Sequence, residues 1–320
     1  MTTLLEVLIE QFKTNTYGKN CEGQRKWLKD NSPKFSTPLA DEDLCVALAL
    51  AHNDMARRAN GHTNEVKVAS VKWLYDHFTK NSPFGIKSQA KFDTWHDKTC
   101  GQYCLHMKAQ TFPKKFDITY GRAQKVLNMT FKYLYCTTNY KSEVVKIVEY
   151  LHMTLDSYTL RWYKDAIVIP TPGLNAGDIS NWSKMNEPYP KHQYIDLTRD
   201  EGIQKGIQNR IRDFLSQPSP MYEYTIDTES IGEIDQTDDE ESGSSKKKKS
   251  KKITVSLAVS KHPFFAEFVI WRGEIIRAKM EALFSGLNGF YKTLADDTCA
   301  INANITAELK AKIGAILANL

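Results

Sequence analysis

The sequence predicts a mainly α-helical, bundle-like globular protein with one small antiparallel β-hairpin. Apolar residues recur at three- and four-residue intervals through most of the chain, which is typical of amphipathic helices. Strand-like alternation is clear in two stretches, about 222–227 and 253–259, which we expect to pair as the hairpin. The sequence has no regular alternation of strand and helix patterns, so we do not expect a doubly wound nucleotide-binding sheet.

The chain has 320 residues, which is long enough to bury one sizeable hydrophobic core or two. We expect an N-terminal helical region, 1–110, and a second region, 111–320; the alternative is that both share one core. No apolar run approaches the ~20 residues that a transmembrane helix needs, and the first residues lack the basic start of a secretory signal. Six cysteines without a CxxC pair indicate reduced thiols, so we expect a cytoplasmic protein without membrane association.

Helices are predicted for most of the first region. Thr3 and Glu6 match a capping box that opens a helix through Phe12. Glycines and prolines indicate a loop over residues 13–40. Three more helices are predicted, the first from Asp41 to Arg58, the second over 64–80 and the third from Ser88 past Tyr103.

The segment Phe116–Tyr163 is the most apolar and aromatic long stretch, so the other elements are expected to pack around it. It is interpreted as a first helix carrying Leu127 and Phe131, a second that begins at Ser142 and runs through Leu155, and a third beginning at Asp156. Ile167–Ile169 is expected to form a short strand.

The C-terminal part predicts a helix behind Thr198 that ends near Leu215, then the two strands, a long helix from Pro263 through Phe284, and a last helix from Thr306. Between the strands, the stretch from Glu229 to Lys252 holds seven acidic residues and six lysines. That composition cannot bury enough apolar surface to fold, so residues 228–252 are predicted to form a disordered charged loop.

The central helices carry the candidate catalytic residues, Gln124 and Asn128 on one and His152 and Asp156 on the other. Each pair is spaced i,i+4, so both pairs are expected to approach each other if the helices are antiparallel. A histidine oriented by a carboxylate is the minimal general base. The structural interpretation is that Asp156 caps the following helix and that His152 makes a buried hydrogen bond, and it is preferred to catalysis.

A metal site is a second hypothesis, because His96 and Cys100 are four residues apart and can reach one zinc ion from a helix. Cys104 lies about 12 Å from His96 along the helix axis at ~1.5 Å per residue, so one ion would not take all three ligands. No second cluster of matching spacing supplies the missing ligands. The preferred interpretation is that the cysteines are small core residues.

The Arg57-x4-His62 spacing resembles the catalytic motif of the HEPN ribonucleases, where such a pair serves strand scission at a helix interface. The resemblance covers these two residues only. Asn60-Gly61 stands between them and predicts a helix end before His62, which favours Arg57 as a helix-end charge.

Basic residues suggest contact with nucleic acid. The candidates are Arg122 and Lys125 on the first central helix and the run Lys246, Lys247, Lys248, Lys249, Lys251 and Lys252 in the charged loop. Such lysines would bind phosphate without reading sequence, and in a eukaryotic host they would also favour nuclear localisation. The preferred alternative is a solvated charge run, balanced by the acidic block before it. The net charge of +5 is compatible with an anionic partner and does not require one.

Two functions follow. The favoured one is a soluble intracellular binding protein that contacts nucleic acid or another protein. The alternative is a hydrolase or nuclease of an unfamiliar helical class that uses His152 with Asp156, or a metal held by His96 and Cys100. No known motif indicates an enzymatic activity, since the chain has no P-loop, HExxH or Gly-rich dinucleotide pattern. The sequence does not indicate an oligomeric state either.

Overall fold

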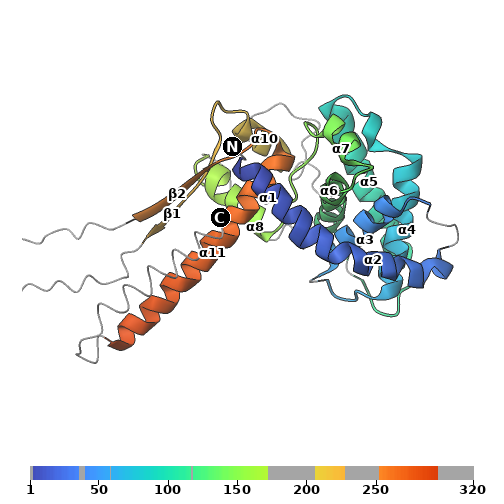
Figure 1. The fold of residues 1–320 in the computed structure, drawn as a ribbon, viewed down its shortest axis with the longest axis horizontal. Helices are drawn as coiled ribbons and strands as arrows, with labels where there is room; N and C mark the ends of the chain where they lie inside the picture. The colour runs from blue at the N-terminus through green and yellow to red at the C-terminus, as the bar shows by residue number, and fades with distance from the viewer. Residues whose placement is uncertain are drawn as a thin grey trace, which may run out of the picture. The chain divides into compact units, whose positions relative to one another are not determined.

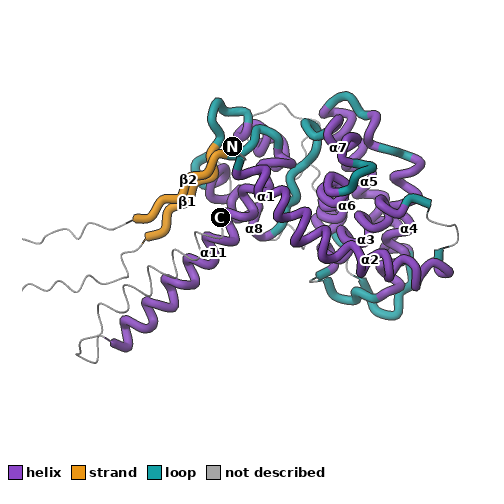
Figure 2. The backbone as a smooth tube through the Cα atoms, viewed as in Figure 1, coloured by secondary structure: helices purple, strands orange, loops and turns teal. Residues whose placement is uncertain are grey.

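The computed structural model of the protein describes residues 3–35, 40–57, 59–116, 118–171, 206–227 and 252–294. These residues are mainly helical, and they include a two-stranded antiparallel sheet (Figure 1). The same view coloured by secondary structure distinguishes the two strands from the helices (Figure 2). The predicted fold class is therefore confirmed. Within the described part, no helix has both the length and the apolar character needed to cross a lipid bilayer.

The chain divides into two compact units. One combines Met1–Pro220 with Val259–Ile270, and the other combines Met221–Ala258 with Trp271–Leu320. The boundary expected near residue 111 stays a prediction. The charged loop 228–251 and the C-terminal helix from Thr306 lie outside the described residues.

The first unit opens with helices α1 (Leu4–Phe12) and α2 (Lys19–Asn31), which a π-helical turn joins without a break. The predicted capping box is confirmed, because the Thr3 hydroxyl accepts from the backbone of Glu6 and the Glu6 side chain accepts from the backbone of Thr3. The loop expected over 13–40 is wrong for residues 13–31. Its glycines, at 18 and 23, lie inside the helical run, where contacts with other helices outweigh their low helix propensity.

Helix α6 (Tyr120–Cys136) lies at the centre of the first unit, as predicted. It packs against α3 (Glu42–Ala56) and α5 (Gln89–Ala109), and α4 (Asn64–Lys80) packs against both α3 and α5 (Figure 1). Most residues of α3 are buried, and so are most of those of α6. The core of this unit therefore forms around these two helices.

The second central helix is shorter than expected. Helix α7 (Lys141–Ile147) begins behind Tyr140 and not behind a Ser142 cap, and no helix continues to Leu155. Residues 151–155 are instead an extended, fully buried stretch. Periodicity alone does not separate a buried helix from a buried extended segment, which explains the error.

Helix α8 (Ser157–Tyr163) begins at the predicted Asp156 cap, and the carboxylate accepts hydrogen bonds from the backbone of Tyr158 and Thr159. A π-helical turn over Lys164–Val168 follows, so the short strand expected at Ile167–Ile169 is wrong. Helix α10 (Ile207–Leu215) completes this part, and the start expected for this helix at Thr198 lies outside the described residues.

The second unit contains the hairpin of β1 (Met221–Asp227) and β2 (Lys252–Ala258), in which Tyr222 pairs with Leu257 and Tyr224 with Val255. This hairpin matches the prediction. The long helix α11 (Pro263–Leu294) extends beyond the end expected at Phe284. Its part in this unit packs against β1, where Tyr222 donates a 3.0 Å hydrogen bond to the buried carboxylate of Glu274.

Candidate functional site

His152 lies at the centre of a buried polar cluster, together with a carboxylate that the sequence did not single out. Its Nε2 donates to Oδ1 of Asp93 on α5 over 2.7 Å, and the two side chains are 0% and 6% exposed. The same Oδ1 accepts from Arg212 on α10 over 3.1 Å and from Gln89 over 2.7 Å. Asp156, the partner expected for His152, uses its carboxylate to cap α8.

Gln124 and Asn128 form a ladder of amides along α6. Asn128 donates to Oε1 of Gln124 over 3.0 Å and to the backbone oxygen of Met153 over 3.2 Å. Gln124 donates to the oxygen of Leu155 over 3.0 Å and accepts from its nitrogen over 3.3 Å. Both side chains therefore hydrogen-bond the backbone of the buried extended segment, as residues in a neighbouring strand would.

Two side chains from later in the chain complete this arrangement. Gln208 accepts from the Met153 nitrogen over 3.1 Å and donates to its oxygen over 2.9 Å. Glu267 on α11 accepts from the Thr154 nitrogen over 2.7 Å and forms a buried ion pair with Lys132 over 2.5 Å. The Thr154 oxygen accepts from the Thr159 hydroxyl on α8 over 2.6 Å, so the backbone groups of the segment 153–155 are satisfied by side chains of α6, α8, α10 and α11.

The electrostatics of the cluster keep its histidines neutral. Burial lowers the pKa of His152 to about 4, although the hydrogen bond to Asp93 opposes the shift. Burial also lowers the pKa of His96, whose ring centroid lies 4.4 Å from that of His152. Burial alone would raise the pKa of Asp93, but the hydrogen bond from His152 and the charge of Arg212 bring it down to about 2. Asp93 is therefore ionised near neutral pH.

The predicted metal ligands are also engaged. Nε2 of His96 donates to Oδ1 of Asn128 over 2.9 Å, which leaves Nδ1 to face the Cys100 sulfur at 3.7 Å. Burial raises the pKa of Cys100, so the sulfur is a thiol and not the thiolate that zinc prefers. In the described ranges, no three His, Cys, Asp or Glu side chains gather as metal ligands.

The remaining sequence candidates are scattered. Arg57 pairs with Asp54 over 2.5 Å at the end of α3, and the His62 ring lies 5.2 Å from that of His52. Arg122 and Lys125 are half-buried in the first turns of α6. Lys246–Lys249 and Lys251 lie outside the described residues, and the backbone of Lys252 begins β2.

Sequence reasoning missed the surface formed by residues 13–34. This segment carries six basic residues, Lys13, Lys19, Arg25, Lys26, Lys29 and Lys34, and two acidic ones, Glu22 and Asp30. All six basic residues are exposed. The signal available in the sequence was the spacing of Gln24, Trp27, Leu28 and Asn31, which lie on one helical face and contact the rest of the unit. Because glycines and prolines dominated the interpretation, that stripe was overlooked.

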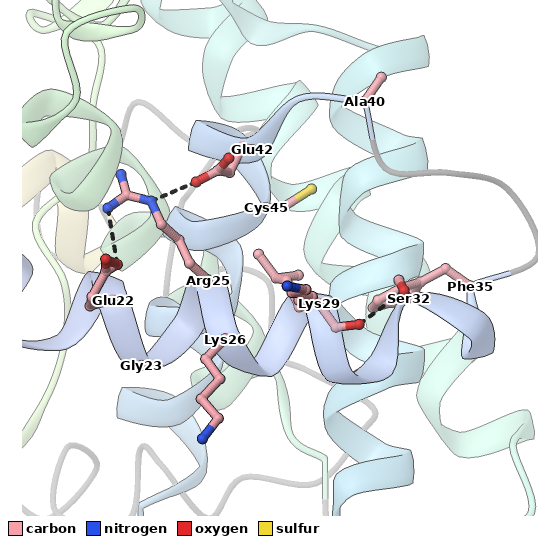
Figure 3. Close-up of a pocket in the computed structure, with 11 residues that line it drawn as sticks. Glu22, Gly23, Arg25, Lys26, Lys29, Ser32, Phe35, Ala40, Glu42 and Cys45 are labelled. Carbon is pink, nitrogen blue, oxygen red and sulfur yellow. Dashed lines mark hydrogen bonds and ion pairs between the residues drawn. The ribbon is translucent and has the colours of Figure 1, made fainter.

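Beside this segment is a cleft of about 960 Å³ between α2 and the start of α3 (Figure 3). Arg25 reaches across it to Glu42 over 2.5 Å and also pairs with Glu22 over 3.6 Å. Lys29 and Cys45 belong to its lining as well.

Comparison with known proteins gives no relative. No protein-family model, no curated protein sequence and no solved structure matches the chain. Only the geometry of the described residues therefore bears on function.

Proposed function

We propose that this chain is a non-enzymatic binding protein that contacts nucleic acid through a cationic surface, defined as the exposed basic side chains of residues 13–34. The observation that carries the proposal is the balance of six exposed cations against two acids on this segment, a net charge of +4 (six minus two). Exposed lysines and arginines on one helical segment bind phosphates by releasing counterions, without reading base sequence.

The buried cluster supports a binding role over a catalytic one. Substrate would have to reach His152, whose side chain is fully buried and already hydrogen-bonded to Asp93. Gln124 and Asn128 use their side-chain amides to hydrogen-bond the backbone of the segment 153–155, which is a structural role. The hydrolase or nuclease alternative, with His152 and Asp156 or with a metal at His96 and Cys100, stays a prediction for which these contacts give less support.

The test compares two variants with equal charge change. Lys13→Gln/Lys19→Gln/Lys34→Gln removes three cations from the surface, and Lys80→Gln/Lys91→Gln/Lys98→Gln removes three exposed cations from α4 and α5. Binding of fluorescent single- and double-stranded oligonucleotides is measured by anisotropy from 50 to 300 mM salt. We expect the first variant to bind more weakly and to reduce the slope of log K against log salt by about one for each lysine that contacts a phosphate.

The control variant is expected to keep the slope of the original protein. Equal weakening in both variants would mean that net charge alone determines binding, which contradicts the proposed surface. Undetectable binding of the unaltered protein at 50 mM salt would reject nucleic acid as the partner. Deleting residues 229–252 in the same assay separates the contribution of the lysine run from that of the surface.

A further inference from the structure

The cleft between α2 and α3 combines an apolar lining with a charged rim. Leu28, Phe35, Ala40 and Cys45 supply the apolar part, and Arg25, Lys26, Lys29, Glu22 and Glu42 supply the charges. Its volume of about 960 Å³ is at the upper end of the range for pockets that hold small organic ligands, roughly 300–1,000 Å³.

The rim has a net positive charge. Arg25 is engaged by both carboxylates, at 2.5 Å to Glu42 and 3.6 Å to Glu22. Lys26 and Lys29 are exposed and form no ion pair within the described residues. Three cations and two carboxylates leave a charge of +1 (three minus two) beside the apolar lining. Lys26 extends from α2 on the side away from Glu42 and Cys45 (Figure 3), so an anionic group at the rim would meet the exposed ammonium group of Lys29.

The chemistry of the lining favours reversible binding over covalent capture. Burial, with the nearby charges of Asp41 and Glu42, raises the pKa of Cys45 to about 12. The thiol therefore stays protonated near neutral pH and is a poor nucleophile. It contributes a small apolar surface to the cleft, as free buried cysteines commonly do.

We propose that this cleft binds a small amphiphile with an apolar chain or ring and one carboxylate or phosphate group. The apolar part lies against Leu28 and Phe35, and the anionic group lies beside Lys29. Arg25, Lys26 and Lys29 belong to both the cleft and the cationic surface, but Lys13, Lys19 and Lys34, which the nucleic-acid test replaces, do not line the cleft, so the two proposals can fail separately. The proposed ligand is small and carries one anionic group. A nucleic-acid strand carries many such groups and does not need the cleft in order to bind the surface.

Isothermal titration with decanoate, decyl phosphate, decan-1-ol and decyltrimethylammonium tests the proposal. The two anions share the apolar chain and distinguish a carboxylate ligand from a phosphate ligand. We expect saturable binding at one site, with a Kd of about 1 mM or tighter for at least one of them, given typical ligand efficiencies. The alcohol and the cation are expected to bind at least about threefold more weakly.

Two variants locate the site. Lys26→Gln/Lys29→Gln is expected to weaken the favoured anion at least about threefold and to leave the alcohol unchanged, whereas Lys80→Gln/Lys91→Gln, with the same charge change, changes neither. Leu28→Gln is expected to weaken all four ligands while circular dichroism shows an unchanged fold. The proposal is overturned if neither anion binds, if the cation binds as well as the anions, or if both lysine pairs have the same effect.

Discussion

Nε2 of His152 lies 2.7 Å from Oδ1 of Asp93, and this contact joins the extended segment after α7 to helix α5. A histidine with a carboxylate partner is a familiar catalytic pair. Here the pair is closed off from solvent and lies in a polar cluster in which Gln124 and Asn128 bind backbone. Among the residues that the structure describes, the buried stretch held by this network has no strand partner, and the members of the network are best tested as structural residues.

Gln124→Ala should destabilise the protein strongly. The substitution removes the donor and the acceptor that serve Leu155 and leaves the amide of Asn128 without one of its acceptors. Unsatisfied buried polar groups cost about 1–3 kcal/mol each, so we expect the free energy of unfolding to fall by at least about 2 kcal/mol. Urea denaturation measures it. Gln102→Ala, on an exposed site of α5, is the control and should change the free energy by less than about 0.5 kcal/mol. Similar values for both would argue against the network.

The free energy of unfolding should depend on pH through His152. Its pKa in the folded protein is about 4, against about 6.5 in an unfolded chain, so the unfolded state binds the proton first as pH falls. The contribution of the neutral histidine to the free energy of unfolding is therefore fully present above pH 6.5. It decreases as pH falls towards 4, by about 1.4 kcal/mol per pH unit for each such histidine. His96 changes in the same direction, because burial lowers its pKa too. His152→Gln should reduce the slope between pH 6.5 and 4.5 in urea denaturation, and parallel profiles would count against a neutral buried histidine.

Lys132→Met should cost about 3–5 kcal/mol, because it leaves the carboxylate of Glu267 buried without its 2.5 Å partner. Burial already raises the pKa of Glu267, and loss of the lysine should raise it further. The difference in stability between the variant and the original protein should therefore shrink as pH falls and Glu267 takes up a proton. Lys146→Met, at a lysine side chain that is 61% exposed, serves as the control and should change stability by less than about 1 kcal/mol. A difference that stays constant with pH would contradict the buried charge.

Gly273→Ala should disturb the packing of α11 on β1. A Cβ at this position would lie 2.3 Å from Cε1 of Tyr222, a distance that real Cβ atoms essentially never show. We expect a loss of about 1–3 kcal/mol and faster hydrogen exchange in β1. Gly101→Ala is the matched control, because a Cβ there meets nothing within 4 Å inside α5. Because alanine has a higher helix propensity than glycine, that change should stabilise the protein by up to about 1 kcal/mol. If both substitutions stabilise, the close approach of Tyr222 to α11 is wrong.

Much of the fold was predictable because it depends on local patterns. The stripes of α3 and α6, the alternation of both strands and the capping residues Thr3 and Asp156 each determine an element within a few neighbouring residues. These features depend little on distant parts of the chain. The helical fold class and the hairpin were therefore correct.

The errors arose where distant contacts decide the structure. Helix α2 forms despite Gly23 because Trp27 donates to Asn64 over 2.7 Å and Gln24 accepts from Lys67 over 2.5 Å. The segment 151–155 is extended because side chains far away in sequence satisfy its backbone. Asp93 was not considered as the partner of His152, since 59 residues separate them. Hydrophobic periodicity within a short window of sequence does not predict contacts between residues so far apart.

Hydrogen exchange at the amides of Met153, Thr154 and Leu155 tests the central claim most directly. These three N–H groups donate to Gln208, Glu267 and Gln124 respectively, at 3.1, 2.7 and 3.3 Å. If the polar side chains hold a buried segment, all three amides should exchange as slowly as those in the middle of α6, and Gln124→Ala should speed exchange at Leu155 most. Rapid exchange at all three amides in the unaltered protein would contradict this role and return His152, Asn128 and Gln124 to consideration as an accessible site.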